Sequence, residues 1–186
     1  MRYKPEYKAE ARAKLLQAAG ALAKEKGFGT TGVDEFMAAA GMTSGAFYSH
    51  FGSKAAFLSA IIANELDRSR HIIAAKDRAS LLKALRKYLS LQHVEHPALG
   101  CPLPSLSSEI ARADTATRQI YEDNLQHQVA AVGSILGDEA LAWALLSQVV
   151  GAVTLARAMA SEEARKAVLN AAIMSLEQQL GDSAAA

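Results

Sequence analysis

The sequence has few of the residues that cross-link or interrupt a chain, and each shortage excludes a class of structure. One cysteine, Cys101, stands among 186 residues, so an intrachain disulfide and a cysteine-rich zinc site are both excluded. The four prolines lie outside the long periodic stretches, as expected if those stretches are helices. No run approaches about 18 uninterrupted apolar residues, and the charged N-terminus has no apolar core. We therefore expect no membrane partner, no signal peptide and a cytoplasmic protein.

Residues that favour strands are also scarce. Val, Ile and Thr together number 22, against 39 Ala and 22 Leu, which are strong helix formers. The composition therefore predicts an all-α chain of about nine helices. Apolar periodicity and breakers place them at 7–26, 33–40, 44–50, 54–75, 79–94, from 102 or 104 onward, 114–136, 139–158 and 161–180.

The net charge of +1 hides an asymmetry along the chain. Residues 1–54 carry eight basic and five acidic side chains, a balance of +3, whereas residues 55–186 carry twelve and fourteen, a balance of −2. A basic N-terminal part on a mildly acidic remainder indicates a polyanionic partner. Chance variation in surface charge explains this difference equally well, so charge alone leaves the question open.

The most informative stretch is FGTTGVDEFMAAAGMTSGAFYSHFGSK, residues 28–54. It reads as two short helices around a tight turn, with Gly41 supplying the left-handed residue. Phe47 and Phe51 are four residues apart and face the core, which leaves small residues on the outer side of the second helix. Small side chains let a backbone approach the DNA bases, and the neighbouring Tyr48 can reach phosphates. A helical hairpin without any DNA role has the same pattern.

Longer stretches of the sequence favour a DNA-binding helix pair over a helical hairpin without a DNA role. The AA..L...KGF ending of the first helix, the Ala-Gly turn at 40–41 and the G.FY.HF helix at 45–51 resemble the DNA-binding domain of the TetR family of transcriptional regulators. The resemblance covers residues 11–58, and the rest of the chain matches in size and helical pattern alone. It implies a helix-turn-helix domain at 1–53 and a ligand-binding and dimerisation domain at 54–186.

The resemblance also implies roles for individual residues. Base-reading positions correspond to Ser44, Gly45, Ala46 and Ser49, and phosphate-contacting positions to Tyr48, His50 and Lys54. Family members commonly have a threonine at the helix start where this chain has Gly32, with Thr31 just before it. The backbone N–H there can still bind phosphate, so we include Thr31 and Gly32 among the expected DNA contacts.

The family resemblance implies a homodimer that binds a double-stranded DNA operator and uses no cofactor. A small apolar or electrophilic effector in the body would move the connecting helix and release the DNA, so we expect a repressor and not an enzyme. A DNA-binding regulator without a ligand is the first alternative, and an enzyme that uses Cys101 is the second.

Cys101 lies in the segment Leu99-Gly100-Cys101-Pro102-Leu103-Pro104. If Pro102 is the first helical residue, Cys101 is the N-cap, where the helix dipole favours a thiolate. The segment resembles a subgroup of the family in which some members sense electrophiles or oxidants through such a cysteine. A buried cysteine that behaves as a small apolar side chain is the alternative.

Other side chains give weaker signals. His93 and His96 are a possible metal pair, but two ligands without a third favour no metal site. Aromatic side chains that could line a ligand cavity, or belong to the plain core, are Tyr88, Tyr121 and Trp143.

The last two expected helices carry apolar stripes that alternate at spacings of three and four residues. Such stripes are typical of helix pairs at a dimer interface, although they also form when helices pack inside one subunit. The residues that we expect at the interface are Leu145, Val149, Ala152, Leu169, Ile173 and Leu176.

Overall fold

The computed structural model describes residues 5–182, and all regular structure in that range is helical. The all-α prediction is confirmed. The described elements are α1 (Pro5–Lys26), α2 (Val33–Ala39), η1 (Ser44–Ala46), α3 (Phe47–His50), α4 (Lys54–Ser69), η2 (Arg70–Ile73), α5 (Arg78–Tyr88), α6 (Leu91–Glu95), η3 (Pro97–Leu99), α7 (Leu103–Ile110), α8 (Thr115–Leu136), α9 (Glu139–Ala158) and α10 (Glu162–Asp182).

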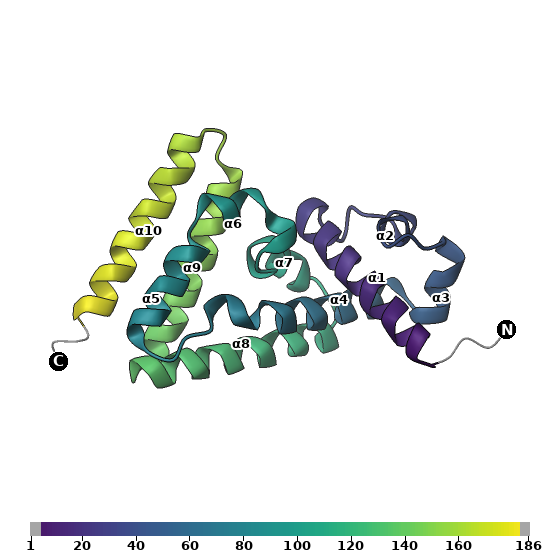
Figure 1. Cartoon of the computed structure of the whole chain (residues 1–186), viewed down its shortest axis with the longest axis horizontal. Coiled ribbons are helices and arrows are strands. Elements are labelled where there is room, and N and C mark those ends of the chain that lie inside the picture. Colours follow the sequence, from purple (N-terminus) through teal and green to yellow (C-terminus); the bar gives the residue numbers. More distant parts are fainter. Residues whose placement is uncertain (1–4, 183–186) are drawn as a thin grey trace.

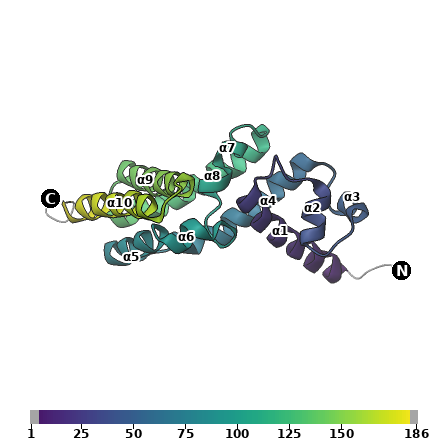
Figure 2. The same ribbon diagram turned by 90° about the horizontal axis from the view of Figure 1, so that it is seen from above.

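The molecule is elongated, with a small group of helices at one end and a larger bundle at the other (Figure 1). We call residues 5–53, which include α1, α2 and α3, the head, and residues 54–182 the body. Helix α4 starts against the head and runs into the body, where α8 packs along it. Seen from above, α9 and α10 lie next to each other at the far end from the head (Figure 2).

Local sequence signals explain most helix ends. Gly27, Gly41 and Gly137 have φ values of 85°, 70° and 75°, a left-handed conformation that glycine adopts without strain. The prediction of one helix at 79–94 is wrong, because this segment forms the two helices α5 and α6. The Ser90 side chain accepts a hydrogen bond from His93 N and so starts α6 as a separate helix.

The head is held together by aromatic rings. The Phe57 ring lies 4.6 Å from Phe51, 5.4 Å from Phe47 and 5.5 Å from Phe36, measured between centroids. Phe47 and Phe51 face this core, as their spacing predicts, and both are buried. Because Phe57 belongs to α4, the first turn of the connecting helix is part of the head core, just past the predicted domain boundary.

A buried ion pair joins the head to the body. Lys24 Nζ on α1 lies 2.6 Å from Glu65 Oε2 on α4, and both side chains are 4% exposed. The same ammonium donates to the Gly100 carbonyl at 3.0 Å. Gly20 permits the close approach of these helices, since a Cβ there would overlap the Glu65 carboxylate. The pair therefore sets how α1 rests on the body.

Removing one partner of this pair leaves the other charge buried. We expect Lys24→Met to lower the free energy of unfolding by about 3–5 kcal/mol, and Lys24→Met/Glu65→Leu to recover most of that loss. Urea denaturation followed by circular dichroism measures both. The matched control is Lys26→Met, which breaks the exposed Lys26–Glu35 pair and should shift the midpoint little. Equal midpoints for Lys24→Met and Lys26→Met would contradict the role assigned to the buried pair.

Candidate nucleic-acid interface and body cavity

The second short helix of the head presents the outer face that the sequence predicts. Residues 44–50 begin as the 3-10 turn η1 and continue as α3. Ser44, Gly45 and Ser49 are exposed, and the Tyr48 ring is 77% exposed. A Cβ at Gly45 would meet no atom within 4 Å, so this part of the backbone is open to a close partner. The arrangement suits a helix that enters a DNA groove, with Ala46 half-buried behind it.

Two expected phosphate contacts are used inside the head. The Thr31 side chain is buried, and its hydroxyl donates to the Gly27 carbonyl at 2.6 Å, so the prediction that Thr31 contacts DNA is wrong. Lys54 is half-buried, donates to the Thr31 carbonyl at 2.8 Å and lies 5.1 Å from the Phe28 ring centroid. Its phosphate contact stays a prediction. Gly32 is exposed at the start of α2, as expected.

His50 lies at the end of α3, close to basic side chains from α1. Within the described residues, its Nδ1 is buried and has no hydrogen-bond partner. Burial, followed by the charges of Lys8 and Arg12, lowers the pKa of His50 below its usual value. Arg12 also lies 5.1 Å from the Phe51 ring centroid. Lys8 and Arg12 could not be selected from the sequence alone, because their closeness to His50 depends on how α1 crosses α3.

The turn after α1 is held by the body. Phe28 N donates to Glu109 Oε1 at 2.9 Å, and Gly29 N donates to Glu109 Oε2 at 2.6 Å. Both carboxylate oxygens of one α7 residue therefore bind consecutive backbone amides of the head. Hydrogen bonds to a charged acceptor are stronger than neutral ones. This contact is a second connection between head and body, and no local sequence pattern predicts it.

The body contains an apolar cavity of about 270 Å³ between η2, α5, α8 and α9. Pockets that hold small molecules are mostly apolar with a few polar groups, and this lining follows that pattern. Its residues are Arg70, Ile73, Ala74, Ala75, Leu81, Leu85, His127, Gln128, Val129, Ala131, Val132, Ile135, Ala142, Leu145 and Leu146.

None of the four residues expected at a ligand site lines this cavity. Trp143 lies on the outer side of α9 and is 38% exposed. The Tyr121 hydroxyl pairs with Ser107 Oγ at 2.8 Å. Tyr88 is buried against Cys101 and His93, and it borders a second, more polar pocket. Periodicity identified these side chains as large and apolar, but it could not show which helices enclose a space.

Cys101 does not have the environment of a thiolate. Helix α7 begins at Leu103 with Pro102 as its N-cap residue, so Cys101 lies before the helix. The side chain is buried, and this burial raises the pKa of the thiol, although the neighbouring Tyr88 side chain partly opposes the shift. The expectation of an activated thiolate at the N-cap is wrong, and the residue matches the alternative of a buried apolar cysteine.

Both ring nitrogens of His93 are used within the protein. Its Nδ1 pairs with the Tyr88 carbonyl at 2.7 Å, and its Nε2 accepts from the backbone N–H of Cys101 at 3.0 Å. Neither nitrogen is free for a metal shared with His96, nor aimed at the Cys101 thiol. Among residues 5–182, no three His, Cys, Asp or Glu side chains are grouped to hold a metal ion.

The apolar stripes of α9 and α10 pack inside one chain. Five of the six expected interface residues are already buried without a partner, so the alternative of packing within a subunit applies to them. They are Leu145, Val149, Ala152, Leu169 and Leu176, and Ile173 is half-buried. The dimer interface predicted at the five buried positions is therefore wrong, and the interface role of Ile173 stays a prediction.

Three large apolar side chains on the outer sides of α9 and α10 remain exposed. Trp143, Leu155 and Met174 are 38%, 57% and 70% exposed, and small residues such as Ala144 separate them on α9. Among the described helices, α9 alone has the length and apolarity to cross a membrane, with a mean hydropathy of 1.5, and 33% of that window is buried. Its other face packs in the core of the body, so the exposed face has no partner within residues 5–182.

Comparisons with known proteins agree with this architecture. Residues 15–61 match the family model described as bacterial regulatory proteins, tetR family. A search of curated proteins gave no significant match.

Several solved structures have the same fold. The reduced form of NemR from E. coli has a TM-score of 0.74 at 21% identity, covering 91% of this chain and 97% of its own. The TetR-family regulator SCO4454 from Streptomyces coelicolor has a TM-score of 0.71 at 19% identity, and the match covers 94% of this chain and 96% of SCO4454. A TetR regulator from Legionella pneumophila has a TM-score of 0.73 at 16% identity, and the match covers 89% of this chain and 95% of the Legionella chain. The resemblance inferred from the sequence is confirmed for the fold and for the N-terminal segment.

If the head binds a polyanion, the surroundings of His50 would make that binding dependent on pH. Phosphate beside this imidazole would raise the pKa that Lys8 and Arg12 now help to lower, so binding takes up a proton. We expect duplex affinity to rise as the pH falls from 8 to 6. The rise can reach about tenfold for each unit by which the pKa of His50 is higher in the complex than in the free protein. Fluorescence anisotropy of a labelled duplex at constant ionic strength measures this dependence.

The His50→Gln variant should flatten the pH profile. The control is His96→Gln, an exposed histidine of the body that does not line the cavity, which should keep the profile of the native chain. A profile unchanged by His50→Gln would remove the residue from the interface.

Proposed function

We propose that this chain, whose residues 15–61 belong to the tetR family of bacterial regulatory proteins, is a homodimeric repressor. Its head binds operator DNA, and a small molecule in the body cavity releases it. The observation that carries the proposal is the exposed face of residues 44–50, which is held rigidly from behind by Phe47 and Phe51. A reading helix must offer its polar and small side chains outward from a fixed core.

The charges around this face support a nucleic-acid partner. Lys8, Arg12 and Lys14 on α1 are exposed, and Lys8 and Arg12 lie near His50. Basic groups that flank a reading helix supply the phosphate contacts that fix its register on the duplex. In this proposal Tyr48 and His50 contact phosphates, while Ser44, Gly45, Ala46 and Ser49 face the bases.

The cavity favours a regulator with an effector over one without. A pocket of about 270 Å³ lined mainly by aliphatic side chains, with a few polar ones at its open side, has the form of a small-molecule site. The end of α4 and the following η2 contribute Arg70 and Ile73 to its wall, and the start of α4 lies in the head core. A ligand in the cavity can therefore act on the head through α4.

Dimerisation would cover the exposed apolar face of α9 and α10. Large apolar side chains left exposed along two adjacent helices are typical of protein interfaces. Small residues between Trp143 and Leu155 would let a partner helix approach closely. Two copies related by a two-fold axis would present two heads to half-sites spaced by about 34 Å or a multiple of it.

Binding to DNA upstream of its own gene or of neighbouring genes tests the function. We expect a salt-sensitive footprint there, with Tyr48→Ala weakening affinity about equally for all duplexes and Ser44→Ala changing the preference among operator sequences. The matched control for Ser44→Ala is Ser108→Ala, an exposed serine of the body. A protein that shows neither a footprint nor salt-sensitive binding to any duplex is not a DNA-binding regulator.

Sedimentation velocity at micromolar concentration tests the dimer. We expect native protein to sediment as a dimer, and Trp143→Glu/Leu155→Glu as a monomer with unchanged helicity. The control is Leu99→Glu, which places a glutamate at an 83% exposed leucine on η3, away from α9 and α10, and should leave the dimer intact. A dimer that survives the double substitution would show that this face is not the interface.

A further inference from the structure

The chemistry of the cavity wall selects among effectors, and this inference rests on the proposed function. Twelve of the fifteen lining residues are aliphatic, and the other three are Arg70, His127 and Gln128. No aspartate or glutamate lines the cavity. A buried cation would therefore find no countercharge at this wall, whereas an anion would find a guanidinium.

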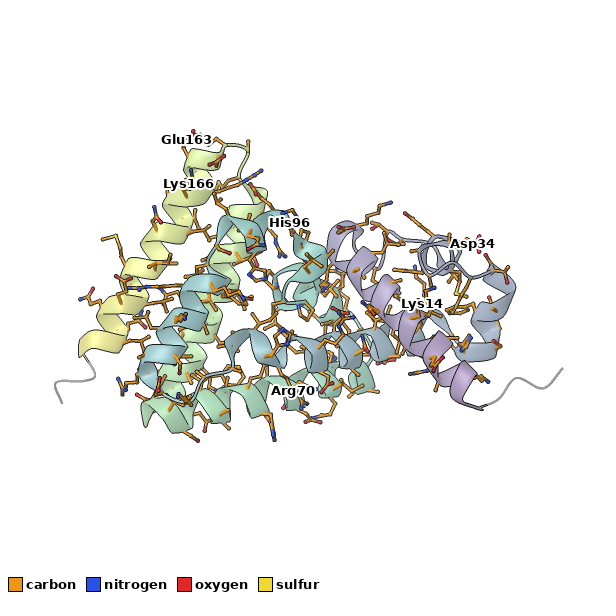
Figure 3. All side chains as sticks on the ribbon, in the orientation of Figure 1. Lys14, Asp34, Arg70, His96, Glu163 and Lys166 are labelled. Atoms are coloured by element: carbon orange, nitrogen blue, oxygen red, sulfur yellow. The ribbon has the colours of Figure 1, made fainter. Side chains whose placement is uncertain are left out.

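Arg70 stands where a ligand's polar end would emerge. It follows the last residue of α4, and Figure 3 places it where this helix meets α8. One guanidinium nitrogen donates to Asn124 Oδ1 on α8 at 2.9 Å, which holds the group at this edge of the cavity. The side chain is 51% exposed, and the only carboxylate paired with it among the described residues, Asp67, is 72% exposed and lies 3.6 Å away. An exposed pair at this distance contributes little, so most of the guanidinium's hydrogen-bonding capacity remains for an anion.

The polar and apolar parts of the wall are segregated. Arg70 and His127 are exposed, whereas Leu81, Leu85 and Leu145 are buried. A molecule that fits both parts has one anionic end and an unbranched or compact apolar remainder. At about 30 Å³ for a group the size of water, 270 Å³ holds roughly nine such groups.

We propose that the cavity binds an amphipathic monocarboxylic acid, with its hydrocarbon part among the leucines and its carboxylate on Arg70. A hydrocarbon of about eight to ten carbons fills the space. The guanidinium can bind both oxygens of a ligand's carboxylate at once. A ligand that ends in a hydroxyl or an ammonium cannot form this two-point contact. The carboxylate stays near water at the edge of the cavity, which limits the cost of desolvation.

A matched series of ten-carbon probes tests the proposal. Isothermal titration calorimetry of the native protein, without DNA, compares decanoate, decanol and decylamine. We expect decanoate to bind at least about tenfold more tightly than either of the others, as one charge-assisted contact provides. Affinity should also rise about fourfold per methylene from hexanoate to decanoate and then level off.

Variants identify the residue that selects the acid. Arg70→Gln should reduce decanoate affinity to that of decanol, and Arg70→Lys should keep part of the preference. The control is Arg68→Gln, which removes an exposed arginine two residues away that does not line the cavity and should change nothing. Equal binding of decanoate and decanol to native protein, tighter binding of decylamine, or an unchanged preference in Arg70→Gln would each overturn the proposal.

The ligand proposal and the proposed function can fail separately. Release of operator DNA by another molecule, with no calorimetric binding of decanoate, overturns the ligand class and leaves the regulator intact. Binding of decanoate with the expected selectivity, to a protein that binds no duplex, supports the site and contradicts the function.

Discussion

The buried pair between Lys24 and Glu65 fixes the relation of head to body on which the structure depends. It lies where α1 crosses α4, and its ammonium also holds the Gly100 carbonyl, so one charge connects three segments. A buried ion pair contributes less to stability than to specifying one arrangement, because desolvation offsets much of its attraction. We infer that the Lys24–Glu65 pair acts in this way and specifies how α1 lies on α4. Gly20 is the matching requirement on α1, since any larger residue would displace the carboxylate.

Glu109 adds a second connection of a different kind. It binds the amides of Phe28 and Gly29, in the turn that leads from α1 to the helix-turn-helix. The head is thus held by α4 through an ion pair and by α7 through backbone hydrogen bonds, while the cavity opens beside η2 at the other end of α4. A ligand that shifts α4 against α7 cannot leave both connections unchanged. Coupling of about 1–3 kcal/mol between two sites is typical of allosteric proteins, and losing one such contact is of that order.

The sequence predicted the features that depend on near neighbours in the chain. Gly27, Gly41 and Gly137 directly follow the expected helix ends at 26, 40 and 136, and the G.FY.HF pattern places Phe47 and Phe51 inward with Tyr48 outward. Features that depend on distant segments were missed or wrong. Lys24 and Glu65 are 41 positions apart, and a lysine on a helix ordinarily indicates a solvated face. The stripes of α9 and α10 were correct as periodic patterns, but periodicity does not say whether the partner helix belongs to the same chain. For the same reason, Tyr88, Tyr121 and Trp143 could not be assigned to a cavity whose walls come from four elements.

Amide hydrogen exchange at Phe28 and Gly29, followed by NMR, tests the central claim most directly. These two amides report on the Glu109 contact, and so on whether the cavity and the head are connected. The account predicts slow exchange in the free protein and in its complex with operator DNA. It predicts at least about tenfold faster exchange at saturating decanoate, in parallel with release of the DNA. If the effector releases the DNA while both amides stay as protected as before, the head is not controlled through this contact and the account is contradicted.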